Sequence, residues 1–265
     1  MTDRDLHLRL LAARAIAREA GKLAHDYFEK RAQLEIERKG MQDLVSVADR
    51  AVEDLIRQRL RGAFPEDDLL GEEGGGAEPR SGAGLWVIDP IDGTANFLRG
   101  MPYWCVAIAY VIEDRVQIGV TYDPVHDELF WARRGGGAHR DQAPIRVSGC
   151  TDPQQAIIGS TYTFKMGIER YVGIIDRILR AGADHRRMGS TALMMCHVAD
   201  GRLDGCVTGY CNSWDVIGGL LLVEEAGGMA RDFLAENGLL EPGSALAGAP
   251  GLHATLEQVR GRSAQ

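Results

Sequence analysis

Two aspartates follow an apolar run in the first half of the chain. The run at 85–88 predicts a buried strand, and Asp89, a proline, Ile91, Asp92 and a glycine predict that the chain then turns. Such a turn can direct both carboxylates and the Ile91 carbonyl into one small volume. That volume would suit Mg²⁺, a cation that prefers oxygen ligands. Asp-Pro or Asp-Gly alone usually marks a surface turn. Whether this segment is a Mg²⁺ site or only such a turn therefore depends on the other acids of the chain.

Further acids could complete such a site, although each also has an ordinary explanation. Asp49 begins a predicted helix, where acids commonly interact with the helix dipole. Glu72 and Glu73 stand between glycines, a pattern that is most typical of a flexible acidic loop. Asp215 follows a tryptophan at another helix start, where Asp usually acts as a cap. Brought near Asp89, these carboxylates would repel one another unless a cation were bound between them.

The elements that must position these acids divide into two halves, 1–150 and 151–265. In the first half, helical spacing of apolar residues predicts helices at 5–29 and at 46–64. Apolar runs separated by turn signals then predict antiparallel hairpins. The expected strands are 103–112, 116–122, 128–132 and 145–147. The first half is therefore expected to consist of helices over an antiparallel sheet.

In the second half, strands and helices alternate, which predicts a mixed α/β arrangement with its own sheet. The expected strands are 156–160, 203–208, 229–230 and 245–246, and the expected helices are 168–181, 191–199, 215–226 and 252–260. Two arginines, a glycine and the hydroxyls of Ser190 and Thr191 stand close to the start of one of these helices. That arrangement suits a bound anion, and it is also typical of an exposed helix start. With no internal repeat or linker in the sequence, we expect the halves to share one interface.

Composition argues against several classes of protein. A net charge of −8 and a pI near 5.4 argue against a nucleic-acid-binding surface, which requires clustered Lys and Arg. The five cysteines are odd in number and contain no C-x-x-C pair, which indicates reduced thiols. The sequence shows neither a secretory signal nor an apolar run as long as a membrane span. We therefore expect a cytoplasmic protein with no membrane partner.

Taken together, the order and spacing of the acidic motifs resemble those of the inositol monophosphatase family. The resemblance covers nearly the whole chain, and its most specific parts are Asp-Pro-Ile-Asp-Gly-Thr at 89–94 and the distant Trp214-Asp215. Members of this family are metal-dependent, lithium-sensitive phosphatases that share a fold with fructose-1,6-bisphosphatase. The resemblance implies an α/β (α+β) fold, a layered αβαβα sandwich, which forms a homodimer and hydrolyses a small phosphate monoester.

The resemblance also implies roles for individual residues. The implied ligands of two or three Mg²⁺ ions are Glu72, Asp89, the Ile91 carbonyl, Asp92 and Asp215. Glu72 belongs to the implied catalytic group as well, together with Asp49 and Thr94. Asp49 and Thr94 match the pair that orients the attacking water.

Other implied residues surround this group. The amides of Gly93 and Thr94 match the donors that hold the phosphate. Glu73 and Lys39 match outer positions near the metals. However, the distance from Lys39 to Asp43 is one residue shorter than the family pattern.

The implied substrate pocket departs from that of inositol-specific members. Those members carry a glutamate seven residues before the aspartate of the Trp-Asp pair, and this chain has Thr208 there. A hydroxyl can still bind a polyol, but a charged acceptor, which makes the stronger hydrogen bond, is lost. The other positions that match substrate contacts are Asp92, Gly93, Thr94, Ser190 and Thr191. Residues 209–213 would line much of the leaving-group pocket.

Three functions are therefore considered. The first is a Mg²⁺-dependent phosphomonoesterase of a small polyol or sugar phosphate, with inositol 1-phosphate as the leading candidate. A close alternative is a histidinol-phosphate phosphatase, an activity found on the same scaffold. The third, from another class, is a non-catalytic regulatory binding protein in transcription or ribosome assembly. The intact acidic motifs argue against a dead enzyme, and the acidic pI argues against direct RNA binding.

Overall fold

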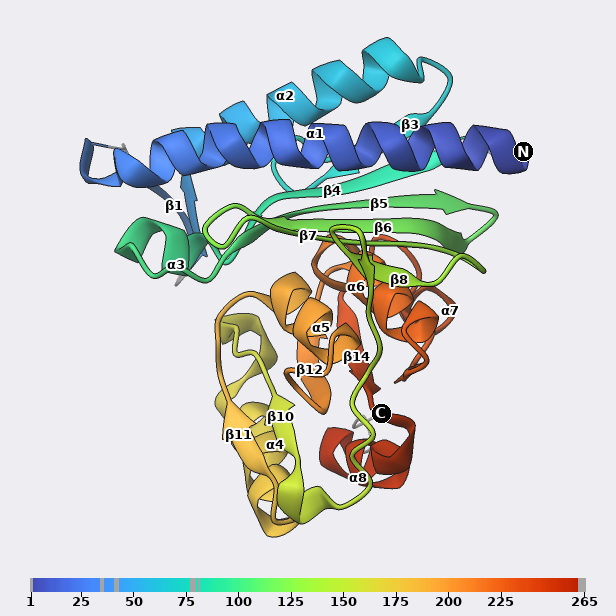
Figure 1. Ribbon diagram of the computed structural model, residues 1–265. Coiled ribbons are helices and arrows are strands. Elements are labelled where there is room, and N and C mark those ends of the chain that lie inside the picture. Colours follow the sequence, from blue (N-terminus) through green and yellow to red (C-terminus); the bar gives the residue numbers. More distant parts are fainter. Residues whose placement is uncertain (1, 34–35, 41–42, 77–79, 81, 262–265) are drawn as a thin grey trace.

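The structure is a computed structural model that describes residues 2–33, 36–40, 43–76, 80 and 82–261 (Figure 1). The helices are α1 (Asp3–Glu29), α2 (Val47–Ala63), α3 (Thr94–Arg99), α4 (Ile168–Arg180), α5 (Thr191–Ala199), α6 (Ser213–Glu225), α7 (Phe233–Asn237) and α8 (His253–Arg260). The strands of the hairpin and the first sheet are β1 (Ile36–Gly40), β2 (Asp43–Ser46), β3 (Asp68–Gly71), β4 (Leu85–Asp92), β5 (Cys105–Ile112), β6 (Arg115–Asp123), β7 (Glu128–Arg133), β8 (Ala138–Arg140) and β9 (Ala143–Pro144). The strands of the second sheet are β10 (Ile157–Gly159), β11 (Asp184–Arg186), β12 (Gly205–Cys211), β13 (Met229–Ala230) and β14 (Gly243–Gly248).

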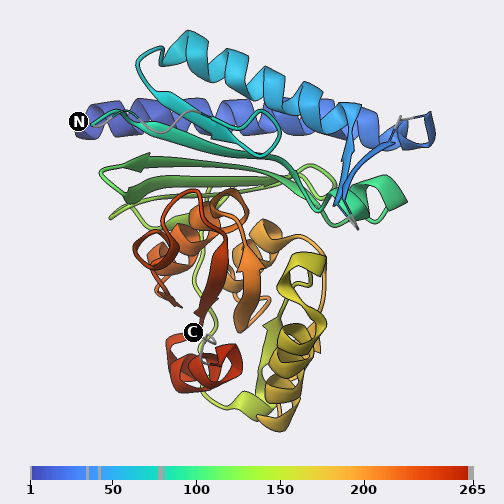
Figure 2. The ribbon, with the colours of Figure 1, turned by 180° about the vertical axis from the view of Figure 1, so that it is seen from behind.

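These elements form five layers, which confirms the predicted αβαβα sandwich. Figure 1 shows α1 and α2 over one face of the first sheet, and α5, α6 and α7 on its other face. The second sheet follows, with α4 and α8 on its far side, and Figure 2 shows the same order from behind. The division into halves at residue 150 stays a prediction, although the strands of the two sheets fall on either side of it.

The first sheet has the strand order β3-β4-β5-β6-β7-β8-β9. Its pairs are antiparallel, as predicted, except that β3 runs parallel to β4. The second sheet has the order β11-β10-β12-β14-β13 and combines parallel with antiparallel pairs, so it is mixed as expected. The parallel pairing of β3 with β4 matters for function, because parallel neighbours bring the residues that follow them to one edge of the sheet.

The boundaries of several elements differ from the prediction. The strand predicted at 145–147 is wrong: this segment belongs to no strand, and the short strands β8 and β9 precede it. The turn expected after residue 88 is also misplaced, because β4 continues through the proline to Asp92 with a shift of register between Asp89 and Asp92. The elements that were not predicted are β1, β2, β3, α3, β8, β9, β11 and α7.

Glycines allow the middle layer to pack closely. A Cβ atom on Gly119 of β6 would lie 2.3 Å from the carbonyl oxygen of Gly218 in α6. A Cβ atom on Gly219, the next residue of α6, would lie 2.5 Å from the Cβ atom of Met195 in α5. Gly119 therefore lets the first sheet approach the backbone of α6 closely, and Gly219 does the same for α5. In the part of the chain described, no helix combines the length and apolar character needed to cross a bilayer.

Candidate active site

The acidic loop and the two aspartates meet at the edge where β3 and β4 end. Gly71 pairs with Ile88 in the parallel register, and the amide of Glu72 donates a 3.2 Å hydrogen bond to the Ile88 carbonyl. Glu72 therefore follows β3 beside the point where Asp89 continues β4. The sequence predicted two nearby loops here, whereas the structure places Asp89 and Asp92 within a strand.

Asp49 and Thr94 approach each other from α2 and α3. Ser46 and Asp49 form a capping box, in which the Ser46 amide and hydroxyl both donate to Asp49 Oδ2 at 2.8 Å. The other oxygen, Asp49 Oδ1, lies 3.4 Å from the Thr94 hydroxyl, which also donates a 3.1 Å hydrogen bond to the Ile91 carbonyl. Burial raises the pKa of Asp49 to about 6. The pair predicted to orient water is thus brought together.

Gly93 makes the turn between β4 and α3. Its φ of +99° lies in the left-handed region, and a Cβ atom there would lie 3.1 Å from the Tyr103 carbonyl oxygen. Only glycine fits both restrictions without strain. The amides of Gly93 and Thr94 stand at the start of α3, where amides have no partner inside the helix. They remain the predicted phosphate donors.

Asp92 joins the two halves of the chain. Its Oδ2 atom accepts hydrogen bonds of 2.6 Å from the Ser190 hydroxyl and from the Ala192 amide at the start of α5. Nearby, the Asn96 side chain donates at 2.7 Å to the carbonyls of Tyr103 and Met188. Burial raises the pKa of Asp92, while the hydrogen bonds that it accepts from Ser190 and Ala192 oppose that rise.

Asp215 is the third residue of α6 and completes a capping box with Asn212. Its Oδ2 atom accepts a 2.7 Å hydrogen bond from the Asn212 amide. The N-cap is Asn212, so the ordinary explanation of Asp215 as the cap is wrong: Asp215 closes the capping box from inside the helix, and it also lies in the acidic group. Burial and the negative charge of Asp92 raise the pKa of Asp215 to about 7.

The carboxylates influence one another strongly. Asp89 is 1% exposed, and burial raises its pKa well above the usual range. The negative charges of Glu72, Asp92, Asp215 and Asp49 raise it further. Oxygen donors that are buried together and repel one another fit a hard cation, which would favour their charged forms.

The coordinating arrangement is not preformed in the side chains. Within the described residues, no three His, Cys, Asp or Glu side chains are grouped closely enough to hold a metal ion as they stand. One oxygen each of Asp92 and Asp215 is already turned toward protein donors. The implied ligand set therefore fits Mg²⁺ by its chemistry and stays a prediction in its geometry.

The predicted substrate residues lie deeper than expected. Thr208 is 0% exposed, and its hydroxyl donates to the Tyr210 carbonyl at 3.0 Å and accepts from Thr161 at 2.8 Å. The Thr208 hydroxyl is therefore occupied by protein partners, namely the Thr161 hydroxyl and the Tyr210 carbonyl. Ser190 is 0% exposed and Thr191 is also buried, at the start of α5. The side chain of Lys39 lies outside the described residues.

Two residues at this site were given no role from the sequence. Glu53, one turn after Asp49 in α2, accepts hydrogen bonds from the amides of Glu73 and Gly74. Asn96 ties α3 to the segment before α5. The helical spacing of Asp49 and Glu53 was a usable signal for the first residue, since it places both acids on one face.

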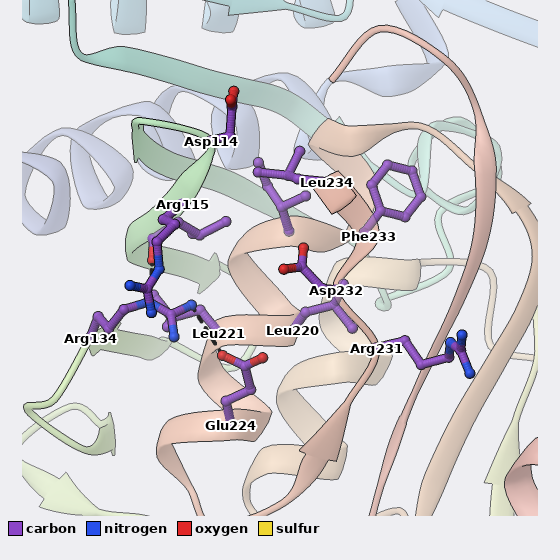
Figure 3. A pocket seen from close by; sticks show the side chains of 12 residues that line it. Asp114, Arg115, Arg134, Leu220, Leu221, Glu224, Arg231, Asp232, Phe233 and Leu234 are labelled. Carbon is purple, nitrogen blue, oxygen red and sulfur yellow. Dashed lines mark hydrogen bonds and ion pairs between the residues drawn. The ribbon is translucent and has the colours of Figure 1, made fainter. Parts of the chain in front are cut away.

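A separate cavity of about 260 Å³ lies toward the other end of α6 (Figure 3). Leu220 and Leu221 of α6 and Phe233 of α7 give it apolar walls, and an ion pair of 3.1 Å joins Arg134 to Glu224 at its edge. The predicted site residues do not line this cavity. The acidic group and the Figure 3 cavity are therefore distinct features of the molecule.

Comparisons with known proteins identify the family of this chain. A model of the inositol monophosphatase family matches residues 5–263. The Nus factor SuhB of Haemophilus influenzae is 37% identical over 239 residues, which are 89% of this chain and 89% of that protein.

Solved structures give the same result. The extragenic suppressor protein suhB from Bartonella henselae superimposes with a TM-score of 0.89 and 29% identity, over 97% of this chain and 100% of that chain. The Thermotoga maritima IMPase superimposes with a TM-score of 0.84 and 30% identity, over 95% and 96% of the two chains. The chain belongs to the inositol monophosphatase family.

Proposed function

We propose that this protein is a Mg²⁺-dependent phosphomonoesterase that hydrolyses a small polyol or sugar phosphate. The observation that carries the proposal is the burial of Asp89 and Asp92 at the end of β4, close enough to the partly buried Asp215 of α6 for the three carboxylates to repel one another. Such a group is unfavourable at neutral pH unless protons or a cation offset its charge. The similarity to an IMPase from Thermotoga maritima supports the same reaction class.

The proposed ion sites are formed by Glu72, Asp89, the Ile91 carbonyl, Asp92 and Asp215. Two or three Mg²⁺ ions bound there would lower the pKa of a coordinated water and stabilise the charge that develops on the phosphoryl group. Glu73 and Lys39 are proposed to act as outer residues.

The residues of the chain itself orient the reaction. The Thr94 hydroxyl donates to the Ile91 carbonyl at 3.1 Å, so its oxygen can accept a hydrogen bond from a water molecule and orient it against the phosphorus atom. Asp49 lies 3.4 Å from that hydroxyl, and a pKa of about 6 leaves its carboxyl mostly ionised at pH 7.5 and able to accept a proton. The Gly93 and Thr94 amides would hold the phosphate oxygens. The products are the free alcohol and inorganic phosphate.

We propose inositol 1-phosphate as the leading substrate and histidinol phosphate as the alternative. Phosphate release from both, measured side by side with and without Mg²⁺, tests the assignment. Turnover of inositol 1-phosphate well above that of histidinol phosphate would support the first assignment, and the reverse would support the second. Comparably poor turnover of both would contradict both substrates.

A regulatory binding role is a second proposal, because the Haemophilus influenzae relative is named Nus factor SuhB. In that case the phosphatase site would be dispensable for the biological role. Mg²⁺ titration separates the two: a purely regulatory protein would release no phosphate from any monoester at any Mg²⁺ concentration. The cytoplasmic location, the homodimer and the absence of nucleic-acid contact stay predictions.

A further inference from the structure

Glu53 is a buried acid that faces the loop carrying Glu72. It lies on the second turn of α2, one turn after Asp49, and is 2% exposed. Its Oε2 atom accepts a 2.8 Å hydrogen bond from the Glu73 amide. Its Oε1 atom accepts a 2.8 Å bond from the Gly74 amide and a 2.6 Å bond from Arg57 Nε. One carboxylate therefore holds two consecutive amides of the acidic loop.

The backbone of this loop is shaped around that carboxylate. A Cβ atom on Gly71 would lie 2.4 Å from Glu53 Oε1, and a Cβ atom on Gly74 would lie 2.8 Å from the same oxygen. Arg57 also donates to the Gly75 carbonyl, and the Gly71 amide donates to that carbonyl at 3.1 Å. The glycines on both sides of the glutamates are therefore needed for close approach, as well as for turning.

These contacts leave Glu72 between two anchors. Its own amide is bound to the Ile88 carbonyl of β4, and the next two amides are bound to Glu53. A residue fixed on both sides loses little conformational freedom when its side chain takes up a ligand. Outer residues that orient a metal ligand in this way strongly affect metal affinity.

We propose that Glu53, supported by Arg57, is a positioning residue that holds the 71–75 loop so that Glu72 faces Asp89. The proposal rests on the proposed function, because it concerns the use of Glu72 as an ion ligand. It assigns to α2 two tasks at one site: Asp49 serves Thr94, and Glu53 serves Glu72.

The test compares Glu53→Gln with Asp54→Asn, a charge-matched change at the next, exposed position of α2. An amide at 53 would present an NH₂ group to one of the two backbone donors, so at least that hydrogen bond is lost, and the Arg57 bond is lost with it if the NH₂ group takes the Oε1 position. Mg²⁺ affinity, measured by calorimetry without substrate, should fall about 10-fold in Glu53→Gln. The KM for the phosphate ester, measured at saturating Mg²⁺, should stay unchanged.

Hydrogen exchange supplies a readout that does not depend on the metal. Exchange of the Glu73 and Gly74 amides should accelerate in Glu53→Gln and stay as in the wild type in Asp54→Asn. If Glu53→Gln does not fold, Gly74→Ala tests the same contact from the loop side. Its control is Gly62→Ala in α2, where a Cβ atom would meet no described atom within 4 Å.

The possible results separate the two proposals. A wild-type protein that binds no Mg²⁺ would contradict the proposed function, whatever the variants do. A wild-type protein that binds Mg²⁺, with equal affinity and equal amide exchange in the Glu53 or Gly74 variant, would overturn the positioning role. Faster exchange with unchanged affinity would also overturn it, because Glu53 would then only stabilise the loop.

Discussion

The Ser190 hydroxyl donates a 2.6 Å hydrogen bond to the Asp92 carboxylate across 98 positions of sequence. Ser190 also caps α5, since its oxygen accepts from the Leu193 amide at 3.3 Å. The bond ties the end of β4 in the first sheet to a helix that lies between the sheets. Ser190 was predicted to contact substrate, and the structure instead places its hydroxyl on Asp92.

Replacing Ser190 with alanine should weaken both stability and metal binding. The variant leaves a buried carboxylate without one donor, which should lower the free energy of unfolding by about 1 to 3 kcal/mol. Ser148→Ala is the matched control, because Ser148 donates to Asp204 at the same 2.6 Å far along the chain from the acidic motifs. Both variants should unfold at lower urea concentration, but only Ser190→Ala should need more Mg²⁺ for half-maximal activity. Equal Mg²⁺ requirements in the two would show that the Asp92 bond has no functional role.

The metal-free protein should lose stability as pH rises from 6.5 to 8. The pKa of Asp215 is about 7 in the folded state, compared with its ordinary value of 3.8. The folded state therefore binds the additional proton, and this advantage disappears as the pH passes through the folded pKa. The loss in free energy of unfolding should be of the order of 1 kcal/mol.

Urea denaturation in EDTA at the two pH values measures this effect. The change in the free energy of unfolding between the two pH values should become smaller in saturating Mg²⁺, because the cation favours the charged carboxylate. It should also become smaller in Asp215→Asn. A metal-free wild type that is equally stable at both pH values would contradict the raised pKa.

At lower pH, His197 should make the protein less stable as the pH falls, which is opposite to the effect of Asp215. Its ring nitrogens contact the Tyr103 hydroxyl and Arg202 at 3.1 Å each, and burial followed by the charge of Arg202 lowers its pKa to about 4. Below pH 6.5 the unfolded state binds a proton that the folded state excludes, so stability falls as pH decreases toward 4. His197→Gln should reduce the loss of stability between pH 6.5 and 4.5, as followed by urea denaturation. An unchanged pH dependence in the variant would refute the buried neutral histidine.

Local patterns were sufficient for the long helices. α5 begins and ends as predicted, and α1 begins two residues earlier because Thr2 and Asp5 form a capping box. The pairing of strands that are distant in the sequence could not be predicted from local patterns. β3 was taken for part of a flexible loop, because what stabilises it is its register with β4, in which Gly71 pairs with Ile88.

The candidate site was predictable in its members and less so in its contacts. The family resemblance predicted Asp89, Asp92 and Asp215 as a group, and the structure brings the charges of Asp92 and Asp215 close enough to raise the pKa of the buried Asp89. Spacing could not show that Ser190 serves Asp92, because distant contacts depend on how the two sheets are stacked. It also could not show that the Thr208 hydroxyl is occupied by Thr161 and the Tyr210 carbonyl.

Mg²⁺-dependent phosphate release by wild type and Asp92→Asn tests most directly whether the acidic group holds a catalytic cation. Asn keeps the shape of the side chain and one acceptor for Ser190, so the variant should fold, as circular dichroism and thermal melting can verify. Wild type should show saturable dependence on Mg²⁺ and no turnover in EDTA, while Asp92→Asn should lose about 100-fold or more in turnover. Turnover in EDTA, or near-normal activity of a folded Asp92→Asn protein, would contradict a catalytic cation held by this group.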